Sequence, residues 1–161
     1  MAMRVGERLP PGRVLRMGVN GPEPVDTDDL FRGRRVVLFG VPGAFTGTCS
    51  TAHVPSFVRT RDRLAAKGVD EVVCLSGNDP FVLRAWAEQT GAAGAITFVG
   101  DVTGDWIAAL GQDFSAPERG FVRRCRRFSA LVEDGVVKVW NEEPSPGTCE
   151  ATAGEAMLAA L

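Results

Sequence analysis

The residue pair in this sequence that is best suited to chemistry is Cys49 with Thr46, three positions earlier in the segment T-G-T-C. An apolar run of strand length at 35–41 ends shortly before this segment, and a helical apolar pattern follows it. Cys49 is therefore expected in the first turn of a helix, where unpaired backbone N–H groups and the helix dipole stabilise a thiolate. Because the thiolate is the nucleophilic form of cysteine, the pattern predicts a nucleophilic Cys49.

Thr46 occupies the position that the first cysteine of a C-x-x-C motif would have. A hydroxyl cannot form a disulfide, so dithiol exchange of the thioredoxin type is disfavoured at this site. The Thr46 hydroxyl can instead hydrogen-bond to the Cys49 sulfur or to an oxygen beside it. A thiolate flanked by a hydroxyl and by turn N–H groups suits attack on a polar O–O bond, because charge develops on the leaving oxygen.

The other residues that could bind a metal are widely spaced. The four cysteines, Cys49, Cys74, Cys125 and Cys149, form no C-x-x-C pair, and His53 is the single histidine. We therefore expect no zinc or other metal site. His53 follows Cys49 by four residues and would share its helix face, so a Cys–His dyad is an alternative to a structural histidine.

Apolar periodicity and turn signals predict an α/β layer structure around this pair. The order β-α-β-α-β-α-β-β-α implies parallel strands joined by helices, plus an antiparallel hairpin at the turn signal Asp134-Gly135. We expect a thioredoxin-like fold, with a central mixed β-sheet flanked by helices, in a single domain over residues 1–161. The predicted strands are 13–17, 24–25, 35–41, 71–76, 96–99, 127–133 and 136–141. The predicted helices are 28–31, 54–65, 80–87 after an Asp79 cap, a short helix from a Thr103 cap to Leu110, and 152–161.

The composition of the 161-residue chain limits the classes of function. Apolar residues make up 45% and charged residues 24%, as in an ordinary globular domain. A net charge of −2 gives no reason to expect a nucleic-acid partner. No apolar stretch approaches the roughly 18 residues that span a bilayer, and the first residues lack the apolar core of a signal peptide. We expect a cytoplasmic protein without a membrane partner, whose cysteines are reactive or buried thiols rather than structural disulfides.

The segment PGAFTGTCSTAHVPSF closely resembles the active-site segment of peroxiredoxins, specifically of the fifth, or type II atypical two-cysteine, subfamily. The resemblance extends over VGERLP, VVCLSGNDPFVLRAWA and RRFSALVEDGVVKVWNEEP. It implies a thiol-dependent peroxidase that reduces hydrogen peroxide and alkyl hydroperoxides without a metal or bound cofactor. It also implies a sulfenic acid on Cys49, reduced by glutaredoxin and glutathione or by thioredoxin, and a homodimer. Phe45 and Phe121, in turn-rich segments, are candidate aromatic residues for that interface.

The resemblance implies a role for each of four residues. Cys49 matches the peroxidatic cysteine, Thr46 the peroxide-binding hydroxyl, and Pro42 the residue that shields the thiolate from water. Arg127 matches the arginine that stabilises the thiolate and the transition state. Because this arginine and the helix dipole already account for the thiolate, we expect His53 to be structural rather than a base.

Arg127 belongs to a run of arginines, and such a run is usually a solvated face. In a regular strand Arg127 would share a face with Arg123 and Cys125, while Arg124 and Arg126 would point to the other face. We choose Arg127 because it directly precedes an apolar strand and matches the family position. Arg124 and Arg126 are the alternatives.

Three routes could resolve the Cys49 sulfenic acid. Cys149 lies in the loop 144–149, which we expect to be mobile, and it resembles the C-terminal resolving cysteine of animal members, so it ranks first. Direct reduction of Cys49 by glutathione or glutaredoxin ranks second. Cys74 resembles the second cysteine of plant members but lies in a buried strand, so it ranks third. We assign no role to Cys125.

Two other classes of function compete with the peroxidase. A thiol-disulfide oxidoreductase or redox sensor could use the same fold, and Thr46 in the C-x-x-C frame argues against the oxidoreductase. A non-catalytic interaction module is the remaining alternative.

Overall fold

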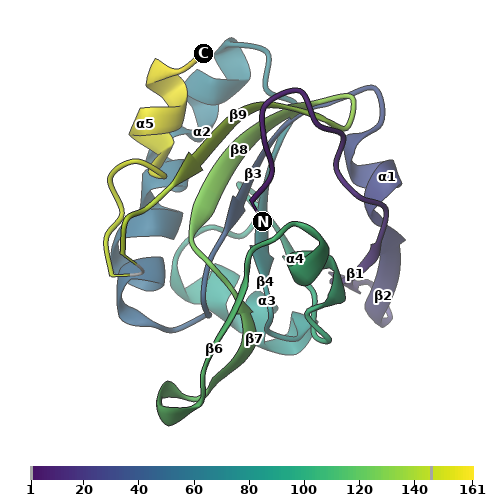
Figure 1. Cartoon of the computed structure of the whole chain (residues 1–161), viewed down its shortest axis with the longest axis vertical. Coiled ribbons are helices and arrows are strands. Elements are labelled where there is room, and N and C mark those ends of the chain that lie inside the picture. Colours follow the sequence, from purple (N-terminus) through teal and green to yellow (C-terminus); the bar gives the residue numbers. More distant parts are fainter. Residues whose placement is uncertain (1, 146) are drawn as a thin grey trace.

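A mixed sheet of seven strands passes through the protein (Figure 1). The computed structural model describes residues 2–145 and 147–161, so Met1 of the predicted domain and Pro146 of the predicted loop 144–149 lie outside the described residues. The strands of this sheet are β1 (Arg13–Gly18), β2 (Gly21–Asp26), β3 (Arg35–Gly40), β4 (Glu71–Ser76), β5 (Thr97–Gly100), β8 (Phe128–Glu133) and β9 (Val136–Glu142). Their order across the sheet is β2-β1-β5-β4-β3-β8-β9.

The pairing of these strands confirms the predicted mixture of parallel and antiparallel neighbours. Strand β4 lies parallel to both β3 and β5, whereas β8 is antiparallel to β3 and to β9. The turn between β8 and β9 is Asp134-Gly135, with φ angles of 48° and 79°. Positive φ at both central residues is what the tight hairpin turn requires, so the predicted hairpin is confirmed.

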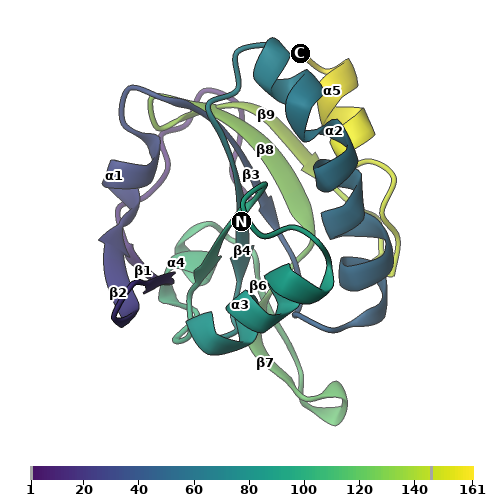
Figure 2. The ribbon, with the colours of Figure 1, turned by 180° about the vertical axis from the view of Figure 1, so that it is seen from behind.

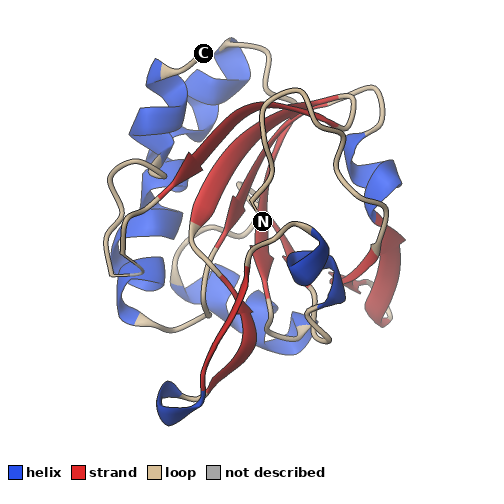
Figure 3. Cartoon of the chain, viewed as in Figure 1, coloured by secondary structure: helices blue, strands red, loops and turns tan. Residues whose placement is uncertain are grey.

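Alternating side chains of the central strands build two apolar cores, one on each face of the sheet. In β3, Val36 and Leu38 belong to the first core, while Val37 and Phe39 belong to the second. Helices α1 (Thr27–Phe31) and α4 (Asp105–Ala109) cover the first face. Helices α2 (Val54–Ala66), α3 (Pro80–Gln89) and α5 (Gly154–Ala159) cover the second, as Figures 2 and 3 show. Burial on both faces explains why β3 has no polar side chain after Arg35.

Of the two predicted helix N-caps, one is confirmed and the other is wrong. Asp79 caps α3 by accepting a hydrogen bond of 3.0 Å from the N–H of Val82, as predicted. The predicted Thr103 cap of α4 is wrong, because Gly104 is the N-cap residue. The Asp101 carboxylate instead accepts the N–H of Ile107 at 2.8 Å. Among the described residues, no helix has the length and apolar composition needed to cross a membrane.

A second sheet, which the sequence patterns do not predict, projects from the body of the fold (Figure 1). This ribbon consists of β6 (Asp113–Ala116) and β7 (Phe121–Cys125), joined by the short 3₁₀ helix η2 (Pro117–Arg119). A bulge in β6 and a φ of 48° at Arg123 interrupt its regular pairing. These irregularities and the many arginines obscure the strand pattern in the sequence.

The condition of a regular strand through residues 123–127 is not met. Strand β7 ends at Cys125 and β8 begins at Phe128, and between them the N–H of Arg126 bonds to Gln112 O at 2.7 Å. The Cys125 side chain packs in the first core. Arg127 instead reaches a residue of the second core, so Cys125 and Arg127 do not share a face.

Candidate active site

Cys49 lies just beyond the end of β3, in the first turns of a helical segment that leads into α2. The intervening turn is held against the sheet, because Val41 N bonds to Leu75 O at 3.0 Å and Ala44 N to Asn78 Oδ1 at 2.8 Å. The side chain of Cys49 has no exposed surface. The chain therefore places a buried sulfur at the beginning of a helix, at the edge of the second core.

Cys49–His53 forms a π-helical turn, η1, instead of the ordinary helix that the apolar pattern predicts. Val54 N donates to Cys49 O, which is one residue farther along the chain than an α-helical bond. Pro55 explains the wide turn, because it has no N–H to donate to Thr51 O and its ring would collide with that carbonyl. Trp86 of α3 secures the turn, since its Nε1 donates to Ser50 Oγ at 2.8 Å.

Arg127 is the arginine that lies beside Cys49. Its Nη2 donates to Cys49 Sγ at 3.2 Å, and its side chain is almost completely buried. The alternative arginines lie elsewhere: Arg124 donates to Pro42 O at 3.2 Å, and Arg126 stacks over Phe114. The structure thus brings together the cysteine and the arginine that the sequence analysis selected, from segments far apart in the chain.

His53 contacts Arg127 from the opposite end of the π-helical turn. Its Nδ1 accepts a hydrogen bond of 2.9 Å from Arg127 Nη1, and its Nε2 donates to Thr152 O at 3.0 Å. Complete burial, followed by the neighbouring Arg127 charge, lowers the pKa of His53 to about 3. A neutral imidazole with one donor and one acceptor matches both partners. The ring is therefore placed to orient Arg127, a contact that the sequence analysis misses.

Thr46, Pro42 and Arg127 line a pocket of about 170 Å³, and Arg127 joins this pocket to the buried Cys49 sulfur. The Thr46 hydroxyl donates to Gly43 O at 2.6 Å. Its proton is therefore committed, and its lone pairs remain for a donor that enters the pocket. Pro42 is buried and adds apolar surface beside the turn.

The other three cysteines carry thiols that burial keeps protonated. Burial raises the pKa of Cys74 and of Cys125 well above the usual thiol value, and both side chains are fully buried. Burial also raises the pKa of Cys149, which is half-buried. All four cysteines are free thiols. Within the described residues, no group of His, Cys, Asp and Glu side chains could hold a metal ion.

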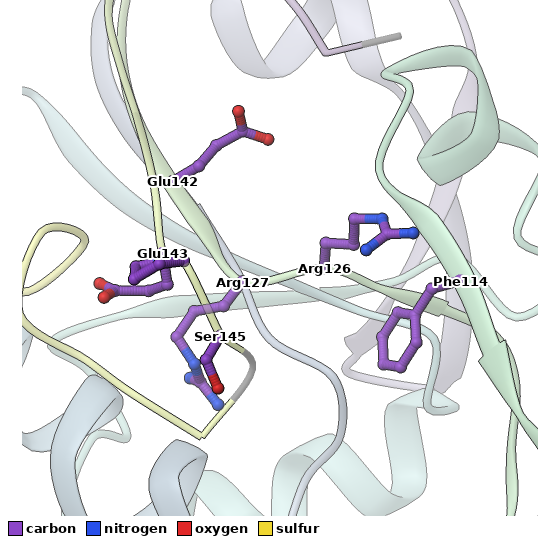
Figure 4. A pocket seen from close by; sticks show the side chains of 7 residues that line it. Phe114, Arg126, Arg127, Glu142, Glu143 and Ser145 are labelled. Atoms are coloured by element: carbon purple, nitrogen blue, oxygen red, sulfur yellow. The ribbon is translucent and has the colours of Figure 1, made fainter.

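The loop that carries Cys149 is fastened by Glu143, although the sequence suggests a mobile segment. One Glu143 oxygen accepts from Glu150 N at 3.0 Å, from Thr152 N at 2.6 Å and from Thr152 Oγ1 at 2.7 Å. The other accepts from Thr148 Oγ1 at 3.1 Å. Figure 4 shows the Glu143 carboxylate turned toward this loop. The loop also contacts the active-site helix, where Thr48 Oγ1 donates to Gly147 O.

Comparison with known proteins identifies the family. A family model described as Redoxin matches residues 4–158. Peroxiredoxin-2B of Arabidopsis thaliana is 39% identical over 158 residues, which cover 98% of this chain and 97% of that protein. The chain belongs to the peroxiredoxin family.

Two further proteins are similar to this peroxiredoxin over most of its length. Mitochondrial peroxiredoxin-2F of Arabidopsis thaliana is 46% identical over 130 residues, or 81% of this chain, and the match spans 65% of that relative's length. Reduced Prx3 from Vibrio vulnificus, solved in complex with hydrogen peroxide, has a TM-score of 0.92 and 36% identity and covers 98% of both chains. The predicted family and the predicted thioredoxin-like fold are confirmed.

Proposed function

We propose that this peroxiredoxin is a thiol-dependent peroxidase that reduces hydrogen peroxide and alkyl hydroperoxides through Cys49. The observation that carries the proposal is the 3.2 Å contact between the buried Cys49 sulfur and Nη2 of Arg127, which lines a pocket together with Thr46. This contact brings the positive charge of the guanidinium to the sulfur that reacts. It also stabilises charge that develops on an oxygen next to that sulfur.

The reaction transfers one oxygen atom to sulfur. The Cys49 thiolate attacks the terminal oxygen of the hydroperoxide, the O–O bond breaks, and its electron pair leaves on the other oxygen. The leaving oxygen takes a proton and departs as an alcohol or as water, while Cys49 becomes a sulfenic acid. Because the Thr46 proton is committed to Gly43 O, the Thr46 oxygen accepts the peroxide O–H and orients the substrate. Pro42 limits access of water to the thiolate.

Cys149 resolves the sulfenic acid in this proposal. Its thiol attacks the Cys49 sulfur, the S–O bond breaks, and water leaves as the disulfide forms. In support, the loop that carries Cys149 contacts the helix that begins beside Cys49, because Thr48 Oγ1 donates to Gly147 O at 3.0 Å. Direct reduction by glutathione or glutaredoxin ranks second, and the fully buried Cys74 ranks third.

Peroxide-treated protein, digested without reductant, tests this step by mass spectrometry. A linked Cys49–Cys149 peptide pair is expected in the wild type and is lost in Cys149→Ser. If the oxidised protein carries only a sulfenic acid or a glutathione adduct on Cys49, Cys149 is not the resolving residue.

The partners follow from the same chemistry. Glutaredoxin with glutathione, or thioredoxin, returns the enzyme to its reduced state. A reducing compartment, the cytoplasm, would keep the four thiols free. Two copies of the chain form a homodimer, and Phe45, with 51% of its surface exposed near the active-site turn, is a candidate contact.

Coupled consumption of NADPH with hydrogen peroxide, in the presence of a thioredoxin or glutaredoxin system, tests the peroxidase. Cys49→Ser should abolish turnover, because a serine hydroxyl is far less nucleophilic at neutral pH. Cys125→Ala provides a matched control and should keep the peroxidase activity. Wild-type turnover by Cys49→Ser would refute the proposal. Reduction of protein disulfides without peroxide consumption would favour an oxidoreductase instead.

A further inference from the structure

Two phenylalanines and two arginines line the pocket that contains Thr46 and the pocket beside it. Phe114 and Phe121 meet edge to face, with ring centroids 5.9 Å apart. The Arg119 guanidinium lies over the Phe121 ring at 5.4 Å, and that of Arg126 lies over the Phe114 ring at 5.8 Å. Across residues 2–145 and 147–161, neither guanidinium has an ion pair or a hydrogen bond. We call these four residues the arginine collar.

The arginine collar spans two adjoining pockets. Thr46, Arg119 and Phe121 line the pocket of about 170 Å³. A neighbouring pocket of about 210 Å³ contains Arg126. Phe114 and Arg127 line both. A molecule whose reactive end lies beside Thr46 can therefore extend over the Phe114 ring and reach a free guanidinium.

The acidic neighbours do not neutralise Arg126. Glu142 and Glu143 also line the second pocket, and Figure 4 shows the Glu143 carboxylate turned away from Arg126. Glu142 accepts a hydrogen bond of 3.0 Å from Gln112 Nε2, and Glu143 fastens the Cys149 loop. Among the described residues, Arg126 thus has no ion-pair partner within 4.0 Å, and its guanidinium lies over the Phe114 ring.

We propose that the arginine collar selects small hydroperoxides that carry a carboxylate. The proposal rests on the peroxidase function above and adds a specificity to it. The apolar part of the substrate packs on Phe114 and Phe121, and the carboxylate pairs with Arg119 or Arg126, whose planar guanidinium matches its geometry. The two adjoining pockets, of about 170 and 210 Å³, together lie near the lower end of the roughly 300–1,000 Å³ of typical ligand sites, so the substrate is compact.

The chemical step is unchanged by the carboxylate. The thiolate of Cys49 takes the terminal oxygen, the O–O bond breaks, and the remaining oxygen leaves with a proton as an alcohol. The product is a hydroxy acid, and the carboxylate itself is neither oxidised nor reduced. The arginines act on binding and encounter rather than on the reacting atoms, so Arg119 and Arg126 are specificity-determining residues.

A matched pair of substrates tests the collar. The carboxylate probe is 4-(2-hydroperoxypropan-2-yl)benzoate, and its methyl ester is the neutral probe with the same reacting group. Stopped-flow measurement of Cys49 oxidation should give a rate constant about fivefold higher for the carboxylate at low ionic strength, the size expected for a pair of exposed charges. The ratio should approach one in about 0.5 M salt, where exposed charges are screened.

Variants test which residues of the arginine collar cause the preference for the carboxylate probe. Arg119→Gln and Arg126→Gln should each lower the carboxylate-to-ester ratio, and the double variant should bring it close to one. Arg123→Gln is the matched control, because this arginine of the same ribbon is paired with Asp105 and lies in neither pocket. Its ratio should equal that of the wild type. The ratio compares two substrates of one variant, so a general loss of activity does not change it.

Four outcomes would overturn the proposal. Equal rates with both probes in the wild type, or a ratio unaffected by the double variant, would remove the collar and leave the peroxidase function intact. Failure of both probes and of hydrogen peroxide to oxidise Cys49 would refute the peroxidase itself. A parallel experiment, the thiol arm, compares 3-mercaptopropionate with its methyl ester as reductants of oxidised Cys49. A charge preference confined to that arm would assign the collar to the reductant instead of the hydroperoxide.

Discussion

Arg127 places one guanidinium nitrogen on the Cys49 sulfur and another on the ring of His53. The first contact brings a positive charge to the nucleophile, and the second fixes the plane in which the guanidinium lies. His53 in turn is held by Thr152 O, close to the loop that carries Cys149. The nucleophile, the cation and the C-terminal loop are therefore linked through one buried imidazole.

Arg127→Ala should lower the rate constant of Cys49 with hydrogen peroxide by about 100-fold or more, because it removes a donor to the charge that develops on oxygen. Stopped-flow oxidation of Cys49 by hydrogen peroxide measures this effect. Arg123→Ala, at an arginine remote from Cys49, is the control. A wild-type rate for Arg127→Ala would show that Arg127 has no role in peroxide attack.

His53 should make the free energy of unfolding depend on pH. Its pKa is about 3 in the folded protein, against 6.5 for an unperturbed histidine. Between these values the unfolded chain binds a proton that the folded protein excludes, so the free energy of unfolding falls as the pH decreases. The loss should be about 2 kcal/mol between pH 8 and pH 5.

Urea unfolding at the two pH values measures this effect. His53→Gln should show a smaller decrease in unfolding free energy, since glutamine does not titrate. An identical decrease in the wild type and the variant would assign the acid sensitivity to other groups.

At the level of elements, the loop between β9 and α5 is the part whose behaviour a single carboxylate controls. Glu143→Gln should loosen this loop, because the charged acceptor of several hydrogen bonds becomes a neutral amide. Formation of the proposed Cys49–Cys149 disulfide should then be several-fold faster once the sulfenic acid exists. Quenched-flow alkylation of thiols after one equivalent of peroxide follows this step. Slower disulfide formation in Glu143→Gln would mean that the fastened loop holds Cys149 in its reactive position.

How well the elements can be predicted depends on how local their causes are. Apolar runs and the Asp134-Gly135 turn predict the central strands and the last hairpin, because burial and turn geometry act over a few residues. The ribbon β6–β7 is missed, since its pairing is irregular and its arginines mask the alternation. The π-helical turn is missed as well, although Pro55 carries a signal for it.

The same difference between local and long-range causes applies to the residues of the candidate site. Cys49 and Thr46 are close in sequence, so their pairing can be predicted from spacing alone. Arg127 reaches Cys49 only because β8 lies beside β3, and the choice among neighbouring arginines needed the family resemblance. The contact between His53 and Arg127 and the role of Glu143 depend on side-chain directions that no sequence pattern encodes.

At the scale of the whole molecule, the proposed homodimer predicts a particle of two chains. Light scattering should give a mass near twice the 17.2 kDa of one chain in the reduced protein. Phe45→Glu should shift the protein toward the monomer, because it places a charge in an aromatic contact. Phe81→Glu changes another exposed phenylalanine and is the control. A mass of one chain in both redox states, over the working concentration range, would refute the dimer.

The hydrogen bond from Trp86 to Ser50 gives the protein an internal optical probe. The indole is fully buried, and its Nε1 bonds to the residue next to Cys49. Any opening of the π-helical turn must break this bond and admit water to the ring, which moves the emission maximum of tryptophan to longer wavelength. With Trp106 and Trp140 replaced by phenylalanine, fluorescence would report in real time whether peroxide oxidation unwinds the turn.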